Sequence, residues 1–217
     1  MILGSSSIVS DESFERQPVS EPVLLAVLNE AASVLRAEEL PFACIGGIAS
    51  AARGRARWTS DIDFFVRPED VKRALGALGD AGFRTQETNE HWIHKAHKDG
   101  VLVDLIFRSE GDITLDEEMM ARTTECEFRG MKIPVIAAED LLVILARATS
   151  EETPHYWHNA LGLIANNDLD WDYVVRRARH GARRVLALLV YAESSDLLVP
   201  DRAIRTLFDR IYPHEGA

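Results

Sequence analysis

The order of strand-like and helix-like runs is the feature of the sequence that most restricts its fold. Up to about residue 136, apolar residues recur at helical spacing over 22–39, 47–54 and 67–82, and runs typical of strands cover 41–47, 61–66, 89–97 and 101–107. The dipeptide Asp99-Gly100 precedes the last run and is a strong hairpin signal. Residues 124–136 predict one or two shorter strands. This alternation predicts an α/β (α+β) fold, a small mixed sheet with flanking helices.

From Ala138 onward the strand signal ends. The segments 138–149, 155–167, 170–194 and 200–212 all have the apolar spacing of helices. We therefore expect a helical domain over residues 137–217 that follows an α/β domain over 21–136. Residues 1–20 are rich in serine and polar side chains, and they predict a flexible lead-in.

Charge and cysteine content restrict the class of protein. The 217 residues carry a formal net charge of −11, which argues against binding nucleic acid through a general basic surface. The two cysteines, Cys44 and Cys126, lie far apart and form no disulfide framework, so we expect a reducing, cytoplasmic location. No apolar run is long enough to span a membrane, and the first residues lack the pattern of a secretion signal.

Three aspartates interrupt strand-like runs. In "DIDFFV", Asp61 and Asp63 project from the same face of the strand, and Asp104 lies inside "VLVDLIF". Buried carboxylates repel one another unless they share a cation, so adjacent strands would bring three metal ligands together. Such oxygen ligands suit Mg²⁺ or Mn²⁺ ions, which bridge phosphates. The alternative is that the aspartates cap turns or pair with Arg57 or Arg108.

A pair of glycines precedes the aspartates. Gly46 and Gly47 lie at a strand end, before a helix made almost wholly of small residues. A phosphate could approach this backbone closely and meet the positive end of the helix dipole. A Gly-Gly pair by itself more often marks a tight turn.

Taken together, residues 41–107 resemble the DNA polymerase beta superfamily of nucleotidyltransferases, which has a Gly-Gly pair, a gap, Asp-x-Asp on a strand and a third Asp on a later strand. The segment "RWTSDIDFF" is similar to the Arg-x-Thr/Ser-x-Asp-x-Asp form of minimal bacterial nucleotidyltransferases, including the abortive-infection (type IV toxin-like) group. The resemblance implies the nucleotidyltransferase fold, with residues 21–136 as the catalytic domain.

The resemblance also implies roles for individual residues. Gly46 and Gly47 would hold the triphosphate of the NTP. Asp61 and Asp63 would hold the metal ions, and Asp104 would complete the metal site and act on the acceptor hydroxyl. The residues expected near the phosphates are Arg57, Thr59 and Ser60.

The C-terminal half is similar to the helical region of the toxin-like group, where "AEDLLV" matches a helix start. That group often has a lysine five residues after the Asp of this motif, and an aspartate in the next helix. This chain has Leu145 and Asn159 there. Arg147 lies two residues further on, which in a helix is a turn of about 200° away from Leu145. These departures keep a catalytically degenerate interaction or regulatory module open as an alternative.

Four residues are candidates for the acceptor side of the site: His91, Trp92, Arg147 and Asn159. The basic run over 176–184 predicts ion pairs with neighbouring acids, and alternatively a local RNA or phosphate footprint.

The sequence thus predicts a metal-dependent nucleotidyltransferase that uses Mg²⁺ or Mn²⁺ to transfer NMP from ATP or another NTP to a hydroxyl acceptor. The acceptor could be RNA, a protein or a small molecule. The resemblance adds a possible place in a toxin–antitoxin system with an antitoxin-like partner. A second enzyme class stays open, the aminoglycoside-type antibiotic nucleotidyltransferases, because they share the Gly-Gly and Asp-x-Asp pattern.

Overall fold

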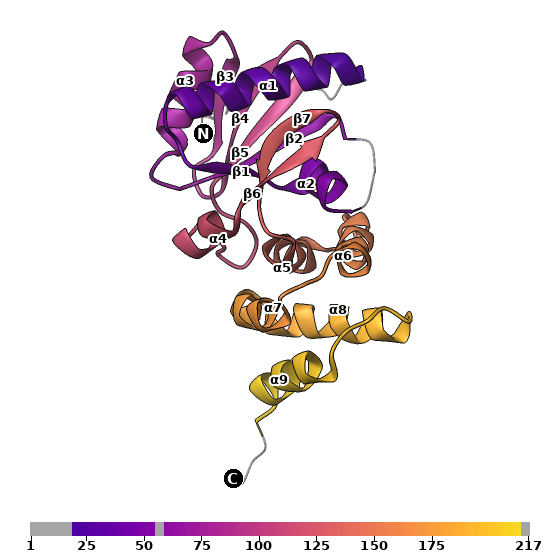
Figure 1. Cartoon of the computed structure of the whole chain (residues 1–217). Coiled ribbons are helices and arrows are strands. Elements are labelled where there is room, and N and C mark those ends of the chain that lie inside the picture. The colour runs from indigo at the N-terminus through magenta and orange to yellow at the C-terminus, as the bar shows by residue number, and fades with distance from the viewer. Residues whose placement is uncertain (1–18, 55–58, 214–217) are drawn as a thin grey trace, which may run out of the picture.

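A computed structural model of the chain describes residues 19–54 and 59–213. Figure 1 shows an α/β part that contains the sheet, followed by helices that lead away from it. The helices are α1 (Glu21–Ala37), α2 (Gly46–Arg53), α3 (Val71–Asp80), α4 (Glu117–Arg122), α5 (Ala138–Ala148), α6 (His155–Asn166), α7 (Trp171–Arg177), α8 (Ala182–Ser194) and α9 (Asp201–Ile211), with a 3-10 turn η1 (Ala178–His180) between α7 and α8.

The described residues form one sheet of seven strands in the order β3-β4-β5-β2-β1-β7-β6. The strands are β1 (Phe42–Cys44), β2 (Asp61–Val66), β3 (Arg84–Asn89), β4 (Ile93–Lys98), β5 (Val101–Ile106), β6 (Thr124–Phe128) and β7 (Met131–Val135). Strand β2 is parallel to β5 and β1 is parallel to β7, whereas the other neighbours are antiparallel. The mixed sheet with flanking helices confirms the predicted fold class.

The predicted turn between β4 and β5 is present. Asp99 and Gly100 both have positive φ, 50° and 82°, as the tightest hairpin turns require. The same pattern recurs at Arg129-Gly130, with φ of 51° and 82°, and joins β6 to β7. The segment 124–136 therefore supplies two strands, at one end of the sheet order.

Two sequence predictions were wrong in detail. The strand expected over 89–97 is split, because β3 ends at Asn89 and β4 begins at Ile93, which puts His91 and Trp92 in a turn. Strand β3 escaped prediction because it is an edge strand of polar, mostly exposed residues and has no apolar alternation. The helix expected over 170–194 is broken at Gly181 into α7, η1 and α8.

Helix α5 connects the sheet to the later helices. Its residues from Ala138 to Ala146 are all buried, so the helix has no solvent face over that stretch. It packs against α2, α6, α7 and α8, and residues of the sheet and of the C-terminal helices belong to one hydrophobic cluster. Helix α6 lies at the level of α5, α7 and α8 lie next to each other farther from the sheet, and α9 lies farthest from it (Figure 1). No described helix is both long enough and apolar enough to cross a membrane.

Candidate active site

The parallel pairing of β2 with β5 brings the predicted aspartates together. Asp63 lies directly opposite Asp104, and Asp61 lies opposite Leu102. Residues in register on neighbouring strands share a face of the sheet, so the three carboxylates project from the same face. Ile62 lies on the opposite face and is fully buried. The central strands thus have an apolar core face and a carboxylate face.

Asp104 has a partner that sequence reasoning missed. It is only 6% exposed, and Lys95, its neighbour on β4, places Nζ 3.1 Å from its Oδ1 atom. The ion pair compensates part of the cost of burying this carboxylate. A signal was available, because the Asp99-Gly100 turn fixes the hairpin register and so pairs Lys95 with Asp104.

Gly46 meets Asp63 directly. Its φ is +61°, and a Cβ atom added there would lie 1.9 Å from Asp63 Oδ2. The amide of Ile45 donates a hydrogen bond to the backbone oxygen of Asp63 at 3.0 Å. Helix α2 begins at Gly46, so its free amide groups and the positive end of its dipole lie beside this carboxylate. Gly47 is buried in the first turn of the same helix.

The predicted phosphate-side residues are placed in part. Thr59 is 5% exposed and donates a hydrogen bond from Oγ1 to Asp61 Oδ1 at 2.5 Å, which fixes the orientation of that carboxylate. Ser60 directly precedes β2 and is partly exposed. Arg57 lies outside the described residues.

A cleft of about 470 Å³ opens beside the carboxylates, between the sheet and helices α5 and α6. Its charged and polar lining includes Asp63, His91, Arg108, Glu110 and Asp112. Its apolar lining includes Ile45, Trp92, Ile106, Ile144, Leu145 and Tyr156. The turn that holds His91 and Trp92 therefore borders the same cleft as Asp63.

The other two acceptor-side candidates do not line this cleft. Arg147 packs against glycine backbone, since a Cβ atom on Gly181 would lie 1.9 Å from its Cδ atom and one on Gly111 2.9 Å from its Nε atom. Asn159 is 1% exposed, and its side-chain oxygen and nitrogen have no hydrogen-bond partner among the described residues. The functional role of both residues stays a prediction.

The donor set suits a divalent cation in kind, because carboxylate oxygens are the ligands that Mg²⁺ and Mn²⁺ prefer. Asp61 and Asp63 are two residues apart in β2 and therefore lie on the same face of the strand, where both can offer such oxygens. Across the described residues, however, no group of three or more His, Cys, Asp or Glu side chains is arranged to hold a metal ion. In this arrangement the charge of Asp104 is balanced by Lys95, 3.1 Å away.

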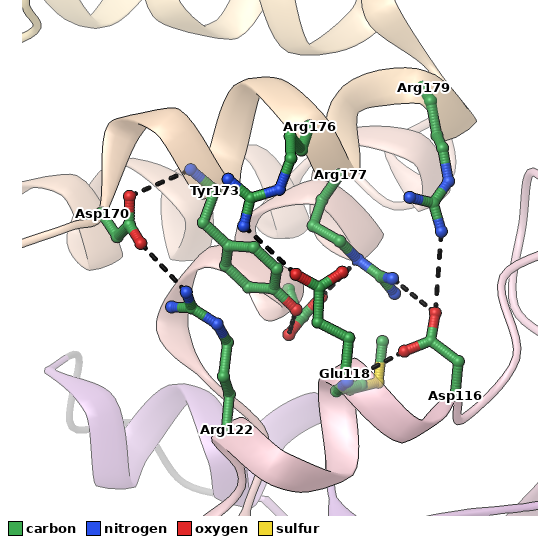
Figure 2. A network of polar contacts seen from close by, with 10 residues as sticks. Asp116, Glu118, Arg122, Asp170, Tyr173, Arg176, Arg177 and Arg179 are labelled. Carbon is green, nitrogen blue, oxygen red and sulfur yellow. Dashed lines mark hydrogen bonds and ion pairs between the residues drawn. The ribbon is translucent and has the colours of Figure 1, made fainter.

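A buried ionic network joins α4 and its N-cap, α5 and α7. Figure 2 shows the side chains of α7 and of the α4 region that take part in it. Arg177 is 1% exposed; its Nε is 2.7 Å from Asp140 Oδ1, and its Nη1 is 2.5 Å from Asp116 Oδ2. Tyr173 donates its hydroxyl to Asp140 at 2.8 Å. Burial raises the pKa of Asp140 to about 6, although Arg177 and the Tyr173 hydroxyl oppose the shift.

The basic run contributes to this network. Arg176 lies 3.1 Å from Glu118, and Arg179 lies 3.7 Å from Asp116. Figure 2 shows these arginines directed toward acidic residues of α4 and its N-cap. The predicted pairing of the basic run with neighbouring acids is confirmed.

Comparison with solved structures shows the same fold in proteins of low sequence identity. An antigenic nucleotidyltransferase-like protein from Paracoccidioides brasiliensis is 14% identical, with 91% of this chain and 100% of that chain covered at a TM-score of 0.54. The antibiotic-resistance factor ANT(2'')-Ia is 16% identical, with 90% and 100% covered at a TM-score of 0.52. A crystal structure of ANT(2'')-Ia with adenylyl-2''-tobramycin is also 16% identical, with 80% and 99% covered at a TM-score of 0.51.

No curated protein matches the chain. A protein-family model described as "Uncharacterised nucleotidyltransferase" matches residues 19–194, which span both the sheet and helices α5 to α8. The chain therefore belongs to this family and is a nucleotidyltransferase.

Proposed function

We propose that the protein transfers NMP from an NTP to a hydroxyl group of an acceptor and that the transfer depends on Mg²⁺ or Mn²⁺. One observation carries the proposal: Asp63 lies opposite Asp104 on neighbouring strands and also against the backbone of Gly46 at the start of α2. Carboxylates and a helix N-terminus meet there, and these are the groups that bind a metal ion and a phosphate chain.

Each residue then has a stated task. Asp61, oriented by Thr59, and Asp63 would hold the metal ion. The backbone amides of Gly46 and Gly47 would receive the triphosphate, with Ser60 and Arg57 beside it. When bound, the ion would neutralise charge on the phosphates and on the leaving pyrophosphate.

Asp104 would accept the proton of the acceptor hydroxyl as its oxygen attacks the α-phosphorus. A bond forms between that oxygen and phosphorus, and the bond from phosphorus to the bridging oxygen of pyrophosphate breaks. The products are the nucleotidylated acceptor and pyrophosphate. Lys95 would keep Asp104 in place for this step, because its ammonium group contacts one oxygen of the carboxylate.

Narrower forms of the proposal concern the biological setting. The resemblance to toxin-like proteins suggests a toxin with an antitoxin-like partner, and growth inhibition on expression, relieved by Asp63→Asn, would support it. The aminoglycoside-type alternative predicts instead a raised tolerance of the host to these antibiotics. We place the protein in the cytoplasm, in accord with the free thiols of Cys44 and Cys126.

The test is transfer of label from each α-³²P-NTP, with Mg²⁺ or Mn²⁺, into RNA, lysate protein and a pool of small molecules. The wild-type chain is compared with Asp63→Asn and with a control, Asp80→Asn, which changes an exposed aspartate at the end of α3. We expect transfer by the wild type and the control and its loss in Asp63→Asn. A folded wild-type protein that neither transfers label nor binds metal–NTP would contradict the proposal and favour the degenerate module.

A further inference from the structure

The cleft beside Asp63 is apolar where helices α5 and α6 close it. Ile144 and Leu145 of α5 are 5% and 2% exposed and form part of this wall, and Tyr156 of α6 adds an aromatic ring. On the sheet side, Trp92 is 45% exposed, so a large ring surface is open to a ligand in the cleft. Aromatic and aliphatic side chains contribute most binding free energy when they contact an apolar or aromatic part of a ligand.

The described lining of the cleft has few charged side chains, and two of them pair with each other. Asp63 lies at the reactive end, and Asp112 forms an ion pair with Arg108. Among the described lining residues this leaves Glu110 and His91, which are both exposed and lie at the rim. A polycation would need several carboxylates, and a nucleic acid would need several arginine or lysine side chains to meet its phosphates.

The volume points in the same direction. About 470 Å³ lies within the range of sites that enclose a drug-sized ligand. We propose, on the basis of the function proposed above, that the acceptor is a small hydroxyl compound with an apolar ring system and at most one positive charge. Its ring system packs between Trp92 and the wall formed by Leu145 and Tyr156, and its hydroxyl faces the pair formed by Asp63 and Asp104, which lie opposite each other on β2 and β5.

Leu145 determines this selectivity in the proposal. Its side chain is 2% exposed and forms part of the apolar wall of the cleft. A lysine at this position would place an ammonium group in an apolar wall. That charge would repel a cationic ligand, and it would lose its hydration when an apolar ligand covered it, which weakens binding of both.

The experiment first measures binding of Mn²⁺ with the α,β-methylene analogues of the four NTPs to the full chain by calorimetry. The complex is then titrated with two probes, 2-(2-naphthyl)ethanol as an uncharged ring alcohol and neamine as a polycation. We expect the naphthyl alcohol to bind and neamine to bind more weakly. Trp92→Ala and Leu145→Lys should each weaken binding of the alcohol by about tenfold, as loss of one buried hydrophobic contact predicts.

The controls separate the possible failures. Leu198→Lys changes a leucine that is 92% exposed and outside the cleft, so it should leave both affinities unchanged. Trp92 lies in an exposed turn, so its variant keeps the test valid if Leu145→Lys does not fold. Nucleotide binding without alcohol binding, or unchanged alcohol binding in Trp92→Ala, would overturn this inference alone. Tighter binding of neamine, or of a short RNA, would overturn it as well. Alcohol binding without nucleotide binding would support the cleft assignment and count against the proposed function.

Discussion

At Gly46 the backbone conformation and the contact with Asp63 both require a residue without a side chain. Gly46→Ala should destabilise the fold by at least about 1–2 kcal/mol, because alanine is strained at positive φ and its Cβ atom would displace the carboxylate. The same variant should lose metal–NTP binding. Urea unfolding and calorimetry measure the two effects.

Gly76→Ala is the matched control for that prediction. Gly76 lies inside helix α3 and has open space where a Cβ atom would be added. Alanine there should raise the free energy of unfolding by about 0.5–1 kcal/mol, the usual gain in a helix interior. Equal effects of the two substitutions would show that the contact at Gly46 is not the cause.

The ion pair between Lys95 and Asp104 should contribute to the stability of the fold. Lys95→Met removes the ammonium group that pairs with the buried Asp104 carboxylate and should cost roughly 2–3 kcal/mol of stability. Lys72→Met, at a side chain that is 78% exposed, should change stability by less than about 0.5 kcal/mol. Chemical denaturation of both variants measures the difference. Similar small effects would mean that Asp104 does not depend on Lys95.

At the scale of the elements, the network between α4, α5 and α7 makes stability depend on pH. The pKa of Asp140 is about 6 in the fold, compared with an ordinary value of 3.8. Between these values the folded state binds a proton that the unfolded state has released, so the contribution of Asp140 is present at low pH and is lost as the pH rises toward 6.

The free energy of unfolding of the wild type, minus that of Asp140→Asn, should fall by roughly 3 kcal/mol between pH 4 and pH 7, at about 1.4 kcal/mol for each pKa unit. Denaturation curves at several pH values measure it. A difference that rises with pH would mean that Arg177 outweighs burial and keeps Asp140 charged in the fold.

The same scale shows what the sequence could predict. The Asp99-Gly100 turn and the apolar run of β5 were readable, because the turn chemistry and the burial pattern agree there. The polar strand β3 could not be predicted, because its residues show no strand pattern and it is a strand only through its pairing with β4. Helix α4 is only six residues long. Its N-cap residue Asp116 accepts a hydrogen bond from the Met119 amide at 2.8 Å. In the sequence, such a short segment after an aspartate cannot be distinguished from a turn.

For the site, the sequence was enough to predict that three aspartates share one face of the sheet and that a pair of glycines precedes them. The strand alternation and the order of elements were sufficient for that. The cleft could not be predicted from the sequence, because only tertiary packing brings α5 and α6 next to the residues of the sheet that line it. The arrangement of Asp104 with Lys95 needed the hairpin register to be followed residue by residue.

At the scale of the whole molecule, the hydrophobic cluster extends from the sheet through α5 to the later helices. We expect one cooperative unfolding transition, reported alike by circular dichroism and by the fluorescence of Trp157 and Trp171 in a Trp58→Phe/Trp92→Phe background. Leu142→Ala, at a fully buried position of α5, should lower stability by about 2–5 kcal/mol and keep the two signals coincident. Two separate transitions would mean that the helical region folds independently.

Arg147 and its two glycines have a consequence for how this sequence can change. The arginine comes from α5, Gly111 from the loop after β5, and Gly181 from the junction before α8, so three distant segments share one tightly filled space. A methyl group added at Gly181 would meet only atoms of the arginine side chain, so it has room if that side chain moves or becomes smaller. A methyl group at Gly111 would also lie 2.6 Å from the backbone oxygen of His180, where φ is +85°, so a smaller residue at position 147 does not make room for it. In a combinatorial library, larger residues at Gly181 should therefore be accepted together with a smaller residue at Arg147 and rejected singly, whereas Gly111 should stay glycine.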